Sequence, residues 1–119
     1  MKKMLAMFLA LMTVLCFGTA GLAEEPIKLG SLVGITAPDP SIALAMDRGF
    51  QLAVEEVNAA GGIAGRQLEY ISYDVGAWDT REAINGYTYL ADEEGCVAIM
   101  GCPVSDIGLA LIDLSLIHI

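Results

Sequence analysis

The chain has 119 residues, of which 15 are acidic and 6 are basic, and its formal net charge is −9. A chain this acidic repels nucleic-acid phosphates and anionic lipid headgroups, which argues against both as partners. The length suits one small domain with a modest hydrophobic core.

The N-terminal residues have the pattern of an export signal. Two lysines precede an uncharged apolar run over residues 4–17, and small residues follow over 18–23. This order of charge, apolar run and small residues is typical of a cleaved signal peptide. We predict cleavage after Ala23, with Ala20 as the alternative position, and the run is short for a stable membrane anchor. A buried apolar helix is the competing interpretation.

A first strand and helix are predicted after this segment. Residues 27–34 (IKLGSLVG) form a short apolar run, as in a buried strand of a parallel sheet. From about Ser41 the period changes, and apolar side chains recur on one face of a helix: Met46, Phe50, Ala53, Val54 and Val57. Polar side chains are placed on the other faces: Asp47, Arg48, Gln51, Glu55, Glu56 and Asn58. The pair Gly61-Gly62 ends the helix.

A second strand and helix follow the first pair. Residues 67–74 (QLEYISYD) alternate in the manner of a strand. Asp79, with Glu82 three residues later, is expected to begin a helix as a capping pair. Gly95 ends this helix, whose apolar face is formed by Ala83, Ile84, Tyr87, Leu90 and Ala91.

The third unit completes an alternating pattern. Residues 96–101 (CVAIMG) form a continuous apolar strand, and Ser105 or Asp106 caps a helix that runs to Leu111 or later. Strands that alternate with helices predict an α/β fold with a doubly wound, Rossmann-like parallel sheet. Because crossover connections are right-handed, we place the first strand between the other two, in the strand order 2-1-3.

This strand order predicts where a ligand binds. Ligands of open α/β sheets bind at the carboxyl ends of the strands, beside a switch point such as the one between strands one and three. In the loop over residues 101–106, Gly101 lets the backbone approach a ligand closely. The Ser105 hydroxyl and the Asp106 N–H lie at a helix start, which favours a carboxylate. The alternative is that Ser105 only caps its helix.

Other chemistry finds little support in the residues. Gly62 and Gly65 follow a helix instead of a strand, so they lack the context of a dinucleotide-binding motif. No Cys/His cluster has metal-ligand spacing, and Ser105 lacks a general base, which argues against a hydrolase. For Asp74, at the end of the second strand, we favour a loop-capping role over a binding role. We therefore predict a protein that is not an enzyme and uses no cofactor or metal.

Three stretches resemble the type I periplasmic binding proteins of the branched-chain amino-acid (Leu/Ile/Val) transport family. The opening strand IKLGSLVGITAP is similar to that of the family, although Thr36-Ala37-Pro38 has Ala where the family has Gly. The most specific stretch is RGFQLAVEEVNAAGGIAGRQLEYISYD, residues 48–74. The segment GCVAIMGCPVSDIGLAL, residues 95–111, resembles the Gly-x-x-Ser loop and helix of the family.

The resemblance implies a ligand site and a partial domain. It implies that the Ser105 hydroxyl and the Asp106 N–H bind the α-carboxylate of an amino-acid-like ligand, that Val104 lines the site, and that the first loop contributes near Ile42. Residues 24–113 are then an incomplete N-terminal lobe of a two-lobe binding protein that closes around its ligand. The implied protein is extracytoplasmic, monomeric, free of cofactor, and delivers its ligand to the membrane permease of an ABC transporter.

Residues 114–119 (LSLIHI) are interpreted separately. Back-translated, they match one frame of a transposon-end sequencing adapter, so we predict that they are read-through and that His118 carries no function. Two other functions compete with the carrier. A sensory domain of the same fold would belong to a receptor or regulator. A secreted flavodoxin-like enzyme would need a cofactor loop or a nucleophile with its base, and the residues offer neither.

Overall fold

The computed structural model describes residues 24–101 and 104–117. The predicted signal peptide, the loop residues Cys102 and Pro103, and His118 therefore lie outside the described residues. Within the described stretches, no helix combines the length and the apolar character needed to cross a membrane.

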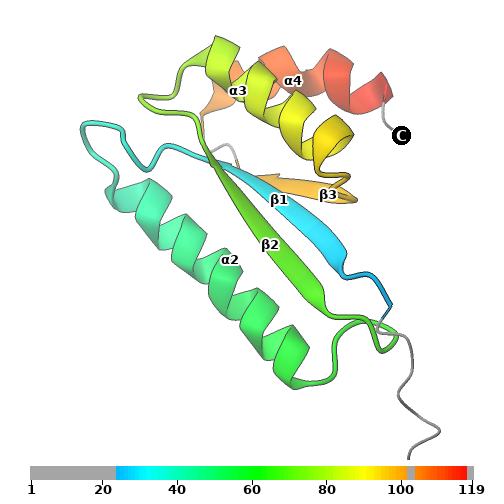
Figure 1. The fold of residues 1–119 in the computed structure, drawn as a ribbon. Coiled ribbons are helices and arrows are strands. Elements are labelled where there is room, and N and C mark those ends of the chain that lie inside the picture. The colour runs from blue at the N-terminus through cyan, green and yellow to red at the C-terminus, as the bar shows by residue number, and fades with distance from the viewer. Residues whose placement is uncertain (1–23, 102–103, 118–119) are drawn as a thin grey trace, which may run out of the picture.

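Three parallel strands form the sheet in the predicted order (Figure 1). β1 (Ile27–Val33) lies in the centre, with β2 (Leu68–Asp74) on one side and β3 (Ala98–Gly101) on the other. The register pairs Val33 with Asp74 and Leu32 with Gly101, so all three strands end at the same edge of the sheet. The α/β class and the 2-1-3 order are confirmed.

Helices cover both faces of the sheet. α2 (Ser41–Ala59) lies on one face, and α3 (Thr80–Thr88), the π-helical turn η1 (Tyr89–Glu93) and α4 (Ser105–Ile117) lie on the other (Figure 1). The main buried cluster packs between the sheet and the second group of helices, and consists of Leu32, Val75, Ala83, Leu90, Ile107 and Leu111. This cluster fixes α4, whose first residue is Ser105, to the strands.

The turn from α2 into β2 has an evident local cause. Gly61 and Gly62 have φ angles of +105° and +77°, which glycine adopts without strain. A Cβ on Gly62 would lie 1.9 Å from the Arg66 carbonyl oxygen. The Asn58 side chain then joins helix to strand, because it accepts from the Leu68 N–H at 2.7 Å and donates to the Leu68 carbonyl at 2.8 Å. The Asn58 side chain thus faces the sheet edge, although the sequence pattern placed it on an outer face.

Most of the predicted apolar face of α2 packs inward, with Val54 buried and Met46, Phe50 and Val57 half-buried. The buried residues of α2 are Ala43, Asp47 and Val54, whereas Ala53, predicted to face the core, is exposed. Asp47, predicted to face solvent, is buried because it accepts hydrogen bonds from the Tyr70 hydroxyl at 2.9 Å and from Gln51 Nε2 at 2.7 Å. Burial raises the pKa of Tyr70 to about 12, so its neutral hydroxyl remains the donor in this pair.

Helix α3 begins as predicted, and β3 begins later than predicted. The Asp79 carboxylate caps α3 by accepting the Glu82 N–H at 3.0 Å. The predicted third strand started at Cys96, but the Cys96 N–H bonds to the Leu90 carbonyl at 2.8 Å and so closes the preceding helical turn. The regular ladder of β3 therefore starts only at Ala98.

Candidate functional site

The loops after β1 and β3 leave neighbouring strands at the same edge of the sheet. β1 and β3 are directly paired, with Leu32 opposite Gly101. Gly101 has a φ of +96°, and a Cβ there would lie 2.9 Å from the Leu32 carbonyl oxygen. The sequence assigned this glycine to the approach of a ligand, and what the structure shows is that its lack of a side chain permits the close approach of β3 to β1.

Three of the four predicted ligand-binding residues lie where α4 begins. Ser105 is the first residue of α4, and both it and Asp106 are exposed, while Val104 is half-buried. The Gly108 N–H bonds to the Val104 carbonyl at 3.1 Å. The N–H groups of residues 105–107 precede that bond and belong to the first helical turn, which favours a negative group. Ile107, almost fully buried, holds this turn against the core.

The fourth predicted residue, Ile42, is on a different element. It lies in the first turn of α2 and is 63% exposed. Because α2 follows β1, its start is at the same edge of the sheet as the start of α4, but on the opposite face (Figure 1). The two parts of the predicted site thus share an edge and approach it from two sides.

Asp74 organises this edge. Its Oδ1 accepts the N–H of Ile35 at 2.9 Å, of Gly76 at 3.0 Å and of Thr36 at 3.4 Å. Partial burial alone would raise the pKa of Asp74, but the hydrogen bonds from Thr36, Gly76 and Ile35 outweigh it and lower the pKa below its usual value. One carboxylate therefore ties the loop after β1 to the loop after β2, which agrees with the loop-capping role that the sequence favoured.

Trp78 also lies at this edge, and no sequence pattern singled it out. It belongs to the loop between β2 and α3, it is the only tryptophan of the chain, and it is half-buried. Its φ is +63°, and its ring packs over Gly34 in the loop after β1. The sequence held no local signal for this arrangement, because the contact of Trp78 with Gly34 joins two loops that are distant in the chain.

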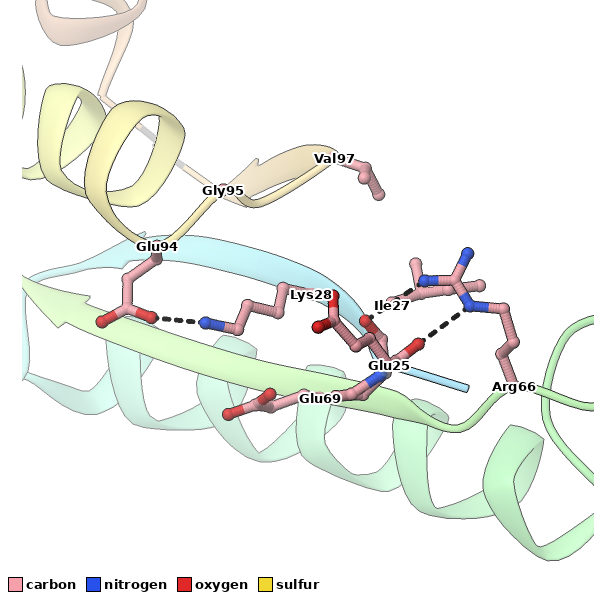
Figure 2. A pocket seen from close by; sticks show the side chains of 9 residues that line it. Glu25, Ile27, Lys28, Arg66, Glu69, Glu94, Gly95 and Val97 are labelled. Carbon is pink, nitrogen blue, oxygen red and sulfur yellow. Dashed lines mark hydrogen bonds and ion pairs between the residues drawn. The ribbon is translucent and has the colours of Figure 1, made fainter. Parts of the chain in front are cut away.

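A hollow of about 550 Å³ lies at the opposite, amino edge of the strands (Figure 2). Lys28 Nζ bonds to Glu94 Oε2 at 2.8 Å, and Arg66 Nε donates to the Glu25 carbonyl at 2.9 Å. The hydrogen bond between Lys28 and Glu94 raises the pKa of the first and lowers that of the second. The positive groups of this hollow are already matched by oxygen atoms within the chain, so we do not regard it as the ligand site.

The donor set at the carboxyl edge can bind a small carboxylate without reacting with it. It offers one hydroxyl and the backbone N–H groups of the first turn of α4, which are suitable ligands for an anion. Within residues 24–101 and 104–117, no group of three or more His, Cys, Asp or Glu side chains is arranged to hold a metal ion.

Comparisons with known proteins agree with this geometry. Residues 26–115 match the family model described as periplasmic binding protein. The chemotactic signal transduction system substrate-binding protein BasB of Halobacterium salinarum is 38% identical over 91 residues, which are 75% of this chain and 22% of that protein. The Leu/Ile/Val-binding protein homolog 7 of Brucella suis is 32% identical over 93 residues, or 78% of this chain and 23% of that protein.

A solved structure shares the fold. The branched-chain amino acid transporter substrate-binding protein LivJ of Streptococcus pneumoniae, solved in complex with isoleucine, superposes with a TM-score of 0.72 at 31% identity. The match covers 78% of this chain and 26% of that one. The chain thus spans about a quarter of the length of the relatives it matches.

Proposed function

This chain belongs to the Leu/Ile/Val-binding family of type I periplasmic binding proteins, and from that premise we propose that it forms part of a carrier for a branched-chain amino acid or a similar small solute. The family binds solutes and is not a family of enzymes. The carrier delivers its ligand outside the cytoplasm to the membrane permease of an ABC transporter, and it acts as a monomer.

The observation that carries this proposal is the start of α4 beside the end of β1. There Ser105 is exposed and begins α4, and we propose that its hydroxyl and the first-turn N–H groups, including that of Asp106, bind a carboxylate. Val104, half-buried next to them, offers an apolar contact, and Ile42 approaches from the other face. Isoleucine, which the Streptococcus pneumoniae protein binds, carries both a carboxylate and an apolar side chain.

The experiment compares Ser105→Ala with the wild type in the protein as its complete gene encodes it. We expect L-leucine, L-isoleucine or L-valine to bind the wild type, and the variant to bind about 10- to 100-fold more weakly, because a hydrogen bond to a charged group contributes about 1.5–3 kcal/mol. Isothermal titration calorimetry measures both affinities. Ser72→Ala, which removes an exposed hydroxyl from β2, is the matched control.

Leucinamide makes the test specific for the carboxylate. The penalty of Ser105→Ala should largely disappear with this ligand, because it lacks the carboxylate that the hydroxyl is proposed to bind. A wild type that binds none of the three amino acids would contradict the proposed ligand class. Equal affinities of the wild type and Ser105→Ala for leucine would contradict the role of Ser105.

A second candidate function is delivery of the ligand to a sensory system. It is favoured by the Halobacterium salinarum relative, whose name assigns it to chemotactic signal transduction. The two functions differ in the step after ligand binding. Deletion of the gene should abolish uptake of radiolabelled ligand if the protein is a transport component, and should abolish the chemotactic response without affecting uptake if it serves a sensor.

The division of the chain is also a proposal. We propose residues 1–23 as the signal peptide, 24–113 as part of the N-terminal lobe, and 114–119 as adapter read-through. The nucleotide sequence tests the last assignment, because codons that differ from the adapter and end in a genuine stop would overturn it.

A further inference from the structure

We propose that Trp78 forms an aromatic wall of the ligand-binding cleft and selects ligands with a bulky apolar side chain. This inference rests on the proposed function, since it assigns a specificity residue to the same site. The ring lies between the loop that leaves β1 and the loop that leaves β2, at the edge where Ser105 begins α4.

The position of the ring is defined by its contact with Gly34. A Cβ built on Gly34 would lie 2.7 Å from Trp78 Cε2 and 3.0 Å from Cδ2, so any side chain at Gly34 would displace the indole. Gly34 directly follows β1, the central strand, whose other neighbour is β3. The ring therefore lies over the end of the strand that borders the switch point.

The backbone of Trp78 is held in an unfavourable conformation. Its φ of +63° lies in the left-handed region, which bulky side chains rarely adopt and which glycine or asparagine tolerates far better. Contacts on both sides maintain it, because the Gly76 N–H bonds to Asp74 and the Asp79 N–H bonds to the Val75 carbonyl. A glycine at this position would adopt the same backbone conformation without strain. Backbone strain that is retained in this way is characteristic of functional sites.

The surroundings of the ring match an apolar part of a ligand. Trp78 and Val104 both pack against the buried cluster that contains Val75 and Ile107, and both remain partly exposed. Both side chains therefore pack on the face of the sheet that carries α3 and α4, and Trp78 follows the carboxyl end of β2. An indole presents a large apolar surface. An amino acid with a large aliphatic side chain therefore gains more binding free energy from contact with it than alanine does.

The test uses the protein as its complete gene encodes it and compares leucine with alanine as ligands by calorimetry. Trp78→Gly removes the ring and relieves the backbone strain, so it should fold. We expect it to bind leucine about tenfold more weakly, or about 1.4 kcal/mol, and alanine less than threefold more weakly. Trp78→Phe, with its smaller ring, should show an intermediate loss for leucine. Phe50→Leu is the control: it reduces an aromatic side chain on α2, on the other face of the sheet, and should leave the leucine-to-alanine affinity ratio unchanged.

Fluorescence gives a second measurement, which follows the wild type and uses Trp78→Phe as its reference. The emission of Trp78, taken as the difference between wild type and Trp78→Phe, should change on addition of saturating leucine. A wild type that binds no amino acid would overturn both the proposed function and this inference. Binding by the wild type together with unchanged leucine affinity in Trp78→Gly, equal losses for leucine and alanine, or unchanged Trp78 emission would overturn this inference alone.

Discussion

Replacing Asp74 by alanine removes a side-chain acceptor that joins the loop after β1 to the loop after β2. Two well-formed hydrogen bonds are lost, from Ile35 at 2.9 Å and Gly76 at 3.0 Å, and a longer one from Thr36 at 3.4 Å. A hydrogen bond to a charged group contributes about 1.5–3 kcal/mol, but water reaches this half-buried site and replaces part of each bond. We therefore expect Asp74→Ala to lower the free energy of unfolding by about 2 kcal/mol at pH 7.

The loss should depend on pH in a defined direction. The pKa of Asp74 is lower in the folded chain than its ordinary value of about 3.9, so the ionised carboxylate stabilises the fold above that value. The stabilisation is lost as the pH falls through the folded pKa. The difference between wild type and Asp74→Ala should thus be constant from pH 5 to pH 8 and shrink below about pH 4.

Urea denaturation followed by circular dichroism measures this difference at each pH. Asp74→Asn keeps an acceptor without the charge, so it should lose about 1 kcal/mol and show a weaker pH dependence. Glu55→Ala removes an exposed carboxylate from α2 and is the control for the change in net charge. If Asp74→Ala is no less stable than Glu55→Ala, or if its deficit is as large at pH 3 as at pH 7, the proposed role of the carboxylate is refuted.

Substitutions at two sites, each with a comparison variant, test the packing of α3 and the link between α2 and β2. Gly86→Ala should cost about 1–3 kcal/mol, because the added Cβ would lie 2.4 Å from the Tyr73 ring. Gly49→Ala, whose Cβ meets nothing within 4 Å, should instead stabilise α2 by about 0.5–1 kcal/mol. Equal effects in thermal melts would contradict the packing of α3 on β2. Asn58→Ala should cost about 2 kcal/mol through its two bonds to Leu68, and Asn58→Asp, which keeps only the acceptor, about half of that. No difference between these two variants in urea denaturation would argue against the donated bond.

The strand order could be predicted from the sequence because its determinants are local. Each strand is a short apolar run, each helix has a readable start or end, and the handedness of the crossovers leaves few arrangements. The same holds for Ser105, which was placed at a helix start by sequence position and lies there in the structure. The predicted start of the third strand at Cys96 was wrong, because the Cys96 N–H still bonds to the Leu90 carbonyl of the preceding helical turn.

Asp47 and Trp78 could not be predicted because their partners are distant in the sequence. A charged residue in an amphipathic helix is normally placed in solvent, and Asp47 is buried only because Tyr70 presents its hydroxyl from β2. Trp78 is defined by its contact with Gly34, which exists only once β1 and β2 are paired. Local patterns thus predict which loops meet at the carboxyl edge, whereas contacts across the sheet decide which side chains are buried or held there.

The charge of the chain bears on which carboxylates it can bind. A net charge of −9 repels a simple anion at long range, and the exposed carboxylate of Asp106 lies within the very turn that offers its N–H groups. At the proposed site, the Ser105 hydroxyl and the helix N–H groups would stabilise a carboxylate only within hydrogen-bonding distance. The electric field of the acidic residues acts over a longer range and on every charge of the ligand. A zwitterion has no net charge to be repelled, and its ammonium group is attracted by the same acidic residues. For the proposed site, the electrostatics of this part of the protein therefore favour a zwitterion over a plain carboxylic acid.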